Sequence, residues 1–406
     1  MLGDKVCAKC GQLIPRGTAA CPVCENLLGF NLRRETVLVL SFVLLAGLFG
    51  ITGIAVKQYH ARERSLGRQW YMRGEKRMAS GHASEAIPDF RTALYHVRGN
   101  SVYQLRLAQS LVDAGSVVEA RTYLLRLWEN NPADGPVNLQ LARLAIRTGD
   151  VSQVIRYYHN AIDGVWPAGE QIQPRALRKA LCEYLISQNH RTEALAELMV
   201  LSNETPNNAA LRTEVAALFL KAQDYDIAFE QFRRSLRLNR RQPAAWAGAG
   251  KAAFMMGNYE TARADLARAR VENPDDAESE ALLSTANDVI ELNPFDRRVP
   301  ASVRRQRAVA AFATAFTRLQ ACAKSRGENL SVAAASPQTG FERLYAAAIA
   351  MKPRMRVERL RRDPDLLDSG MRLVFQIEQS TARECGPPEG RNLALSLIGA
   401  KNGGAN

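Results

Sequence analysis

Residues 36–56 read TVLVLSFVLLAGLFGITGIAV, a run without one charged side chain, with Arg34 and Glu35 before it and Lys57 after it. At about 1.5 Å per residue, a helix of this length spans about 30 Å, the thickness of the hydrocarbon core of a bilayer. Because that core offers no water to backbone groups, a single isolated span must be helical. A buried core helix rarely runs this long without a strongly polar residue, and a cleaved signal peptide is shorter. We therefore predict one transmembrane helix at residues 36–56.

The composition is that of a basic and helical chain. Of its 406 residues, 54 are Lys or Arg and 41 are Asp or Glu, which gives a net charge of +13. Aromatic residues make up only 7%, and Ala, Leu and Arg are abundant, which is typical of an α-helical protein and disfavours a β-sandwich. The positive charge favours anionic partners, but composition alone does not choose among lipid head groups, acidic proteins and nucleic acid.

Two CxxC pairs precede the apolar run, one at Cys7 and Cys10 and the other at Cys21 and Cys24. A CxxC turn aims two thiolates at one cation, and two such turns complete the four-sulfur tetrahedron that Zn²⁺ prefers in structural sites. Residues 1–30 resemble the small zinc-ribbon domains at the N-terminus of many prokaryotic membrane proteins. We predict a structural zinc ion bound by all four cysteines, with no coordination position left open for catalysis. Two disulfides or a redox-active CxxC remain the alternatives.

The zinc site also predicts the orientation of the chain in the membrane. Zinc thiolates require a reducing compartment, so we expect a single-pass protein of the inner (plasma) membrane with its N-terminus in the cytoplasm and the residues after the span outside it. Lys and Arg flank the span on both sides, so the charge distribution does not decide the orientation. Within the span, Ala46 and Gly50 have the spacing of closely packed helix pairs, so a homodimer through this helix is an open alternative to a monomer.

The residues after the span contain an internal repeat of about 34 residues. Its frames begin at residues 67, 101, 135, 175, 209 and 243 and end at residue 276. The eighth position is small in every frame: Gly74, Ala108, Ala142, Cys182, Ala216 and Gly250. The twenty-fourth position is large and apolar: Phe90, Leu124, Tyr158, Leu198, Phe232 and Leu266. The fifteenth position, where two helices would turn, carries residues that accept left-handed backbone angles in most frames: Gly81, Gly115, Gly149, Asn189, Gln223 and Gly257.

This pattern resembles the tetratricopeptide repeat family. The resemblance implies an all-α solenoid of about six helix–turn–helix repeats, at residues 67–100, 101–134, 135–168, 175–208, 209–242 and 243–276. Small side chains at the eighth position would let the two helices of a repeat pack closely, and the bulky twenty-fourth residue would fill the gap to the next repeat. An insertion within residues 164–174 (GVWPAGEQIQP) should bulge or bend the solenoid.

The resemblance also implies a concave face, lined by the first helix of each repeat, that binds an extended peptide or a helix of a protein partner. Apolar and cationic residues are mixed at these positions, which would suit an acidic and hydrophobic segment, although a plain solvated face remains the alternative. The positions carry Leu105, Gln109, Val112, Leu139, Arg143, Ile146, Arg147, Lys179, Lys221, Lys251, Phe254 and Met255. Chaperone-binding members of the family use a clamp of Lys and Asn that no three consecutive frames provide, since Glu183 follows Lys179 where Asn is expected.

Further helices are expected after the last repeat. Residues 277–292 suit a capping helix, and residues 301–398 a C-terminal helical region with helices at 301–326, 341–352 and 366–378. Residues 386–388 (GPP) are expected to end the ordered part, although residues 393–398 could form one more short helix, and residues 399–406 (GAKNGGAN) suit a disordered tail. Cys322 and Cys385 are predicted to form a disulfide if this region is extracytoplasmic, and to stay thiols if it is cytosolic.

No arrangement of residues in the sequence resembles a catalytic centre, so we do not expect an enzyme. The sequence predicts a membrane-anchored scaffold or adaptor that binds other proteins through the solenoid, with a structural zinc ribbon on the other side of the membrane. The alternative is a membrane-tethered regulator whose ribbon contacts nucleic acid or a transcription component while the repeats sense a partner. The ribbon carries few cations, namely Lys5, Lys9 and Arg16, so nucleic acid is the less expected ligand.

Overall fold

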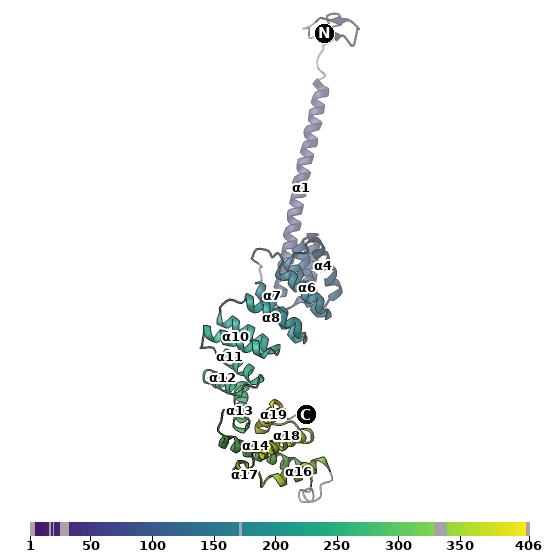
Figure 1. The fold of residues 1–406 in the computed structure, drawn as a ribbon. Coiled ribbons are helices and arrows are strands. Elements are labelled where there is room, and N and C mark those ends of the chain that lie inside the picture. The colour runs from purple at the N-terminus through teal and green to yellow at the C-terminus, as the bar shows by residue number, and fades with distance from the viewer. Residues whose placement is uncertain are drawn as a thin grey trace. The chain divides into compact units, whose positions relative to one another are not determined.

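The computed structural model of the chain describes residues 5–15, 18, 20–24, 32–169, 173–328 and 339–402 (Figure 1). Apart from one pair of two-residue strands, the regular structure of these residues is α-helical, and consecutive helices form hairpins. The predicted all-α fold of repeated hairpins is therefore confirmed. The chain separates into two compact units, Met1–Val165 and Trp166–Asn406, which we describe one after the other. Their boundary falls within the predicted insertion at residues 164–174.

The first unit begins with a small antiparallel pair of strands. Strand β1 (Lys5–Val6) pairs with β2 (Leu13–Ile14), with Lys5 opposite Ile14 and Val6 opposite Leu13. Two strands this short are not stable by themselves in water. The residues packed around them, which include the cysteines, must therefore supply the stability.

Helix α1 (Leu32–Ala79) runs without a break from before the apolar run to the end of the first helix of the first repeat. By length and composition it could cross a membrane: its most apolar window, within Thr36–Ala79, has a mean hydropathy of 2.5, and none of that window is buried. A soluble core helix of this hydropathy would be buried. Residues 57–66 (KQYHARERSL) contain neither Gly nor Pro, so the sequence offers no reason for the helix to end there. The predicted span and the first repeat therefore share one helix.

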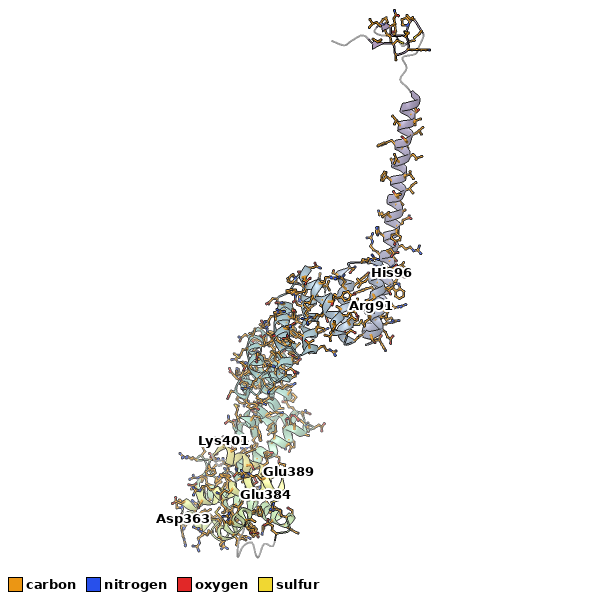
Figure 2. The ribbon with its side chains drawn as sticks, turned by 90° about the vertical axis from the view of Figure 1, so that its right-hand side faces the viewer. Arg91, His96, Asp363, Glu384, Glu389 and Lys401 are labelled. Carbon is orange, nitrogen blue, oxygen red and sulfur yellow. A yellow bond between two sulfur atoms is a disulfide. The ribbon has the colours of Figure 1, made fainter. Side chains whose placement is uncertain are left out.

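Three helical hairpins complete the first unit. The end of α1 pairs with α2 (Ala83–His96), α3 (Ser101–Asp113) with α4 (Val117–Asn130), and α5 (Gly135–Thr148) with α6 (Val151–Ile162). Asn100, Asp134 and Asp150 each accept a hydrogen bond from a backbone N–H three residues later, which caps the helix that follows. His96, which Figure 2 labels, lies beside α1, where its Nδ1 is 2.8 Å from Oε2 of Glu63.

The second unit begins with three more hairpins. They pair α7 (Pro174–Ser187) with α8 (Arg191–Glu204), α9 (Ala209–Lys221) with α10 (Tyr225–Leu238), and α11 (Pro243–Met255) with α12 (Tyr259–Glu272). Each hairpin lies within one of the last three predicted frames, apart from the first residue of α7.

Close packing within a hairpin explains the small residue at the eighth position of each frame. A Cβ atom added at Gly74 would lie 2.7 Å from the ring of Phe90, and one added at Gly250 would lie 2.6 Å from Leu266. The bulky twenty-fourth residue therefore packs onto the eighth residue of its own repeat. The expectation that it only fills the gap to the next repeat was incomplete, because the two residues face each other across the hairpin.

The turn of every hairpin has a left-handed residue at the fifteenth position of the frame. The φ angles are 79° at Gly81, 81° at Gly115, 73° at Gly149, 59° at Asn189, 61° at Gln223 and 73° at Gly257. Asn tolerates this region better than most residues with a side chain, whereas Gln has no such preference. Gln223 is therefore the strained member of the series.

The C-terminal region consists of α13 (Ala277–Leu292), α14 (Ala301–Ser325), α16 (Gly340–Met351), α17 (Val357–Arg362), α18 (Asp365–Cys385) and α19 (Gly390–Lys401). It has its own core, in which Phe312, Leu319, Val374, Ile377 and Leu395 are buried. The expected helices at 277–292, 301–326 and 341–352 are present within a residue or two. Helix α18 is longer than expected, and α17 was not predicted.

Two expectations for the end of the chain were wrong, whereas the alternative of a further helix at residues 393–398 is confirmed by α19. Order does not stop at residues 386–388, because α19 follows them and continues through the first residues of the expected tail to Lys401. Its apolar face buries Ala394, Leu395 and Ile398, and it packs against α13, α14 and α18. The Lys401 ammonium donates a 2.7 Å hydrogen bond to the carbonyl of Gly257 in the last repeat. Residues 403–406 of the predicted tail lie outside the described residues.

Candidate metal centre and partner-binding face

The four N-terminal cysteines form one cluster. Their sulfur atoms all lie within 4.8 Å of one another, with 3.6 Å between Cys7 Sγ and Cys24 Sγ and 3.6 Å between Cys10 Sγ and Cys21 Sγ. Thiolates around a zinc ion, with bonds of about 2.3 Å, are about 3.8 Å apart in a tetrahedron. The four side chains are free of disulfides. Their spacing therefore fits a four-sulfur metal site.

Backbone N–H groups favour the thiolate form of two of these cysteines. Hydrogen bonds from the N–H groups of Lys9 and Cys10 lower the pKa of Cys7 to about 6. The corresponding groups two and three residues after Cys21, in Val23 and Cys24, lower the pKa of Cys21 in the same way. Both CxxC turns therefore aim backbone dipoles at sulfur, which is what a metal-binding thiolate needs.

The cysteines also make up most of the hydrophobic core of the N-terminal segment that contains β1 and β2, which we call the ribbon. Among the described residues, its buried cluster is Cys7, Ile14 and Cys21, with Cys24 packed against it. One apolar side chain and four thiols cannot balance the conformational entropy of ordering such a segment. The ribbon residues therefore fit a domain that depends on a bound ion for its fold.

The positions predicted to line the partner-binding face differ in accessibility. Val112 is 1% exposed and Leu139 is 6% exposed, so these two residues belong to the core and are not available to a partner. The sequence pattern could not distinguish these two buried residues from the accessible ones, because buried and accessible positions lie within one turn of each other on a first helix. The other predicted positions are half-buried or exposed: Leu105, Gln109, Arg143, Ile146, Arg147, Lys179, Lys221, Lys251, Phe254 and Met255.

Two of the cations on this face are paired with carboxylates, one on the first helix of the next repeat and one on α13. The Lys179 ammonium lies 3.3 Å from Oε2 of Glu214, and the Lys251 ammonium forms an ion pair with Glu278. Arg106 makes the same kind of contact, 3.2 Å from Oε1 of Glu75. These pairs link successive repeats and reduce the positive charge that a partner would meet.

Three predicted cations have no carboxylate partner among the described residues: Arg143, Arg147 and Lys221. All three are exposed. Beside them, Ile146 in the first unit is half-buried, and in the second unit Phe254 is half-buried and Met255 is 48% exposed. Each unit therefore keeps a mixed apolar and cationic surface on its first helices.

Sequence reasoning missed three ion pairs whose acids are buried or half-buried, two of them within a repeat and one between the fifth and sixth repeats. Asp89 is fully buried and contacts Arg73 at 2.6 Å and Arg77 at 3.2 Å. Glu197 lies 2.8 Å from Arg178, and Asp265 lies 2.8 Å from Arg233. All three acids occupy the twenty-third position of their frames, directly before the bulky residue. The signal in the sequence for these ion pairs was an acidic residue directly before the bulky apolar residue of the frame.

Cys322 and Cys385 are joined by a disulfide that connects the end of α14 to the end of α18, with 5.8 Å between their Cα atoms. Beside it, the Arg318 guanidinium donates hydrogen bonds to the hydroxyl of Thr381 and the carbonyl of Gly386. Nε of Arg318 is also 3.8 Å from Oε2 of Glu378, whose side chain is 3% exposed. Burial raises the pKa of Glu378 to about 7, against the opposing effect of Arg318.

The comparisons with known proteins address the repeats. Residues 219–285, which cover most of the fifth and sixth frames and part of α13, match the family model described as tetratricopeptide repeat. This segment therefore carries tetratricopeptide repeats, as the frames predicted. No curated protein matches the chain.

Several solved structures of repeat proteins are similar to the chain. The C-terminal part of a TPR repeat-containing protein from Cytophaga hutchinsonii is 14% identical, covers 59% of this chain and 94% of its own, and has a TM-score of 0.43. YrrB, described as a TPR protein with an unusual peptide-binding site, is 16% identical, with 47% and 95% coverage and a TM-score of 0.35. PilW, a type IV pilus biogenesis factor, is 17% identical, with 53% and 98% coverage and a TM-score of 0.38. These values carry no argument about function.

Proposed function

We propose that the protein is a membrane-anchored adaptor that binds a protein partner through the first helices of its repeats. The observation that carries this proposal is helix α1, which contains both the exposed apolar run and the first helix of the first repeat. With the run in a bilayer, residues 57–66 would place the first repeat about 15 Å from the hydrocarbon core. The repeats would then hold a partner close to the membrane surface.

The ribbon would serve as a structural domain on the opposite side of the membrane. Cys7, Cys10, Cys21 and Cys24 would hold a Zn²⁺ ion, which supplies the cross-link that the small core lacks. The spacing of the four sulfur atoms and the backbone hydrogen bonds to Cys7 and Cys21 support this assignment. With four sulfur ligands the ion would have no position for a substrate, so we do not propose catalysis at the ribbon.

Two kinds of cysteine chemistry support the predicted orientation. The four cysteines before the span are free thiols grouped for a metal, which suits a reducing compartment. The disulfide between Cys322 and Cys385 lies after the span, and disulfides persist in oxidising compartments. We therefore place the N-terminus in the cytoplasm and the repeats outside an inner (plasma) membrane.

The proposed partner is a protein segment that combines apolar and acidic side chains. On the first unit, Ile146 would contact apolar side chains of such a segment, while Arg143 and Arg147 would pair with its carboxylates. On the second unit, Phe254 and Met255 would supply the apolar contacts. Because Lys179 and Lys251 already have acidic neighbours, the apolar contacts are expected to contribute more to affinity than the charges.

Photocrosslinking in intact membranes tests the binding face. A photoreactive amino acid would replace Arg147 or Met255 on first helices and, as controls, Val118 or Val271, which are 82% and 80% exposed on second helices. The expected result is one protein adduct shared by the two first-helix positions and absent from the two controls. Adducts that form equally at all four positions, or only at the controls, would exclude the first helices as the binding face.

No observation favours the regulator alternative, and a gel shift with the full chain in detergent would test it. Salt-sensitive binding of DNA that is lost with the zinc would support nucleic-acid contact by the ribbon. Homodimerisation through Ala46 and Gly50 also remains a prediction. In the described structure Gly50 has open space around it, so a second helix could approach there.

A further inference from the structure

A cationic hollow of about 420 Å³ lies between the last two repeats, where α10, α11 and α12 meet. Its lining residues include four arginines, a tryptophan and one acid: Arg233, Arg237, Arg240, Arg268, Trp246 and Asp265. It is distinct from the first-helix face of the proposed function. The hollow lies within the segment that matches the tetratricopeptide repeat family.

Arg233 and Asp265 form the fixed floor of the hollow. Nη2 of Arg233 donates to both carboxylate oxygens of Asp265, at 3.0 and 2.8 Å. The acid side chain is only 4% exposed, and the arginine side chain is 31% exposed. The same guanidinium lies 4.8 Å from the ring centre of Phe229 and 5.5 Å from that of Trp246. The only acid of the lining is therefore already neutralised.

Of the other three arginines, only Arg268 interacts electrostatically with Asp265, and it forms no ion pair with that acid. Arg237, Arg240 and Arg268 are exposed, and no carboxylate pairs with them among the residues that the structure describes. The Arg268 guanidinium lies 5.1 Å from the ring centre of Trp246. Lys179 and Lys251 on the first helices, by contrast, each have an acidic partner. Like charges gathered without counter-charges favour an external anion.

Arg240 lies in the loop between α10 and α11, at the thirty-second position of the fifth frame. Three repeats carry a proline at this position, namely Pro132, Pro206 and Pro274, and the first and fifth carry Arg98 and Arg240. The Arg240 backbone carbonyl accepts a 2.9 Å hydrogen bond from the Trp246 indole N–H, which fixes the ring at the edge of the hollow. Within the described parts of the chain, its guanidinium has no hydrogen bond or ion pair, so it is available to a ligand.

We infer that this hollow, the Arg–Trp hollow, binds an acidic segment of a partner protein that also carries an aromatic side chain. Guanidinium groups match carboxylates in geometry, as the contact between Arg233 and Asp265 illustrates in the same hollow. Arg237, Arg240 and Arg268 would bind carboxylates of the segment, and the Trp246 ring would contact its aromatic residue.

Charge and aromatic content distinguish this ligand from nucleic acid. Single strands are held by several stacking rings along a basic groove, whereas the hollow offers one ring. Three cations would neutralise few phosphates and give weak binding at physiological salt. The mixture of three cations and one fixed ring is better matched to a short acidic and aromatic peptide.

The test uses the full chain in a neutral detergent and a fluorescein-labelled dodecapeptide of alternating Glu and Phe, followed by anisotropy. The double variant Arg237→Gln with Arg240→Gln is expected to raise the dissociation constant about tenfold. A control that removes the same charge from exposed arginines of the first unit, Arg98→Gln with Arg126→Gln, should change it less than about twofold. A peptide with Gln in place of Glu should bind at least about tenfold more weakly than the Glu peptide.

Equal weakening by the two double variants would overturn the inference, because the peptide would then respond to net charge alone. Tighter binding of an oligonucleotide of the same length, with the same sensitivity to Arg237 and Arg240, would overturn it as well. The single variant Trp246→Leu should also weaken the Glu and Phe peptide, and an unchanged affinity would remove the aromatic part of the inference. Crosslinking at Arg147 and Met255 is independent of these results, so either proposal can fail alone.

Discussion

At the scale of single residues, backbone angles decide the turns between paired helices. Six turns place the fifteenth residue of the frame in the left-handed region, and four of the six residues are glycine. The pattern in the sequence therefore has a direct physical cause, since a side chain at positive φ costs about 1–2 kcal/mol for most residues. Gln223, with φ of 61°, is the position where this cost is not relieved.

Replacing Gln223 with Gly should stabilise the second unit. Relief of the left-handed strain, less the extra flexibility of glycine in the unfolded chain, leaves a gain of about 0.5–1 kcal/mol. The thermal unfolding midpoint in detergent measures it. The matched control is Gln188→Gly, because Gln188 has φ of −91° and glycine there should lower the midpoint. A lower midpoint for Gln223→Gly would contradict the strained turn.

Glu378 should make stability depend on pH. Its pKa is raised from 4.5 to about 7 in the folded chain, so between these values the folded state keeps a proton that the unfolded state has lost. Stability therefore falls as pH rises from about 4.5 to 7 and is flat on either side, with a total change of up to about 3 kcal/mol.

The variant Glu378→Gln removes this titration. Its stability should match that of the parent chain near pH 4.5 and exceed it above pH 7. Thermal unfolding midpoints across that pH range measure the difference. Glu384→Gln is a suitable control, because Glu384 is exposed near the end of the same helix. A parent chain whose midpoint does not fall between pH 4.5 and 7, or a variant that falls equally, would show that Glu378 is not the group responsible.

At the scale of elements, the ribbon and α1 differ in what stabilises them. The described part of the ribbon has two short strands and a core made largely of cysteine, so we expect a bound ion to stabilise it. Helix α1 does not need a bound ion, because its C-terminal part packs against α2 and its apolar part would be stabilised by a bilayer.

The ribbon should bind one zinc ion per chain and lose its structure when the ion is removed. Elemental analysis measures the metal, and amide exchange at Val6, Leu13 and Ile14 measures the structure. Cys21→Ser should abolish both, because three sulfur ligands leave the tetrahedron incomplete. Cys182→Ser, which changes a buried cysteine of the fourth repeat, should leave both intact. Metal retained at the parental level in Cys21→Ser would contradict the four-sulfur site.

At the scale of the whole molecule, the chain combines cysteines suited to two redox environments. Free thiols grouped for a metal precede the apolar run, and a disulfide follows it. A membrane between the two groups would resolve this difference, since it can separate a reducing from an oxidising compartment. The topology of the chain is therefore the property on which the proposed function most depends.

Labelling of intact spheroplasts with a membrane-impermeant maleimide should reveal that topology. Cys322 and Cys385 should react only after mild reduction, and the four ribbon cysteines only after lysis and removal of the metal. Cys182 should stay unlabelled while the chain is folded, because burial raises its pKa to about 12. Added protease should digest the repeats in intact spheroplasts. Protection of the repeats until lysis would mean that they are cytosolic and that the orientation is reversed.

Several features could be read from the sequence because they are local or periodic. The apolar run, the CxxC spacing and the repeat frames each depend on residues a few positions apart, and hairpin helices follow the frames closely. The capping helix and α14 followed from helical periodicity in the same way. Helix α17 was not predicted, and α19 was expected only as an alternative at residues 393–398, since short helices next to Pro and Gly are fixed by packing and not by periodicity.

The sequence by itself determined the all-α repeat fold, the candidate membrane span and the candidate zinc ligands, because each is encoded in spacing along the chain. Only the tertiary structure decided which first-helix residues are accessible: it buried Val112 and Leu139 and paired Lys179 and Lys251 with acids from the next helices. It also brought Arg240, Trp246 and Arg268 to one hollow and α19 onto α13. These contacts join residues that are far apart or on different helices, and no spacing within one helix determines how two helices pack.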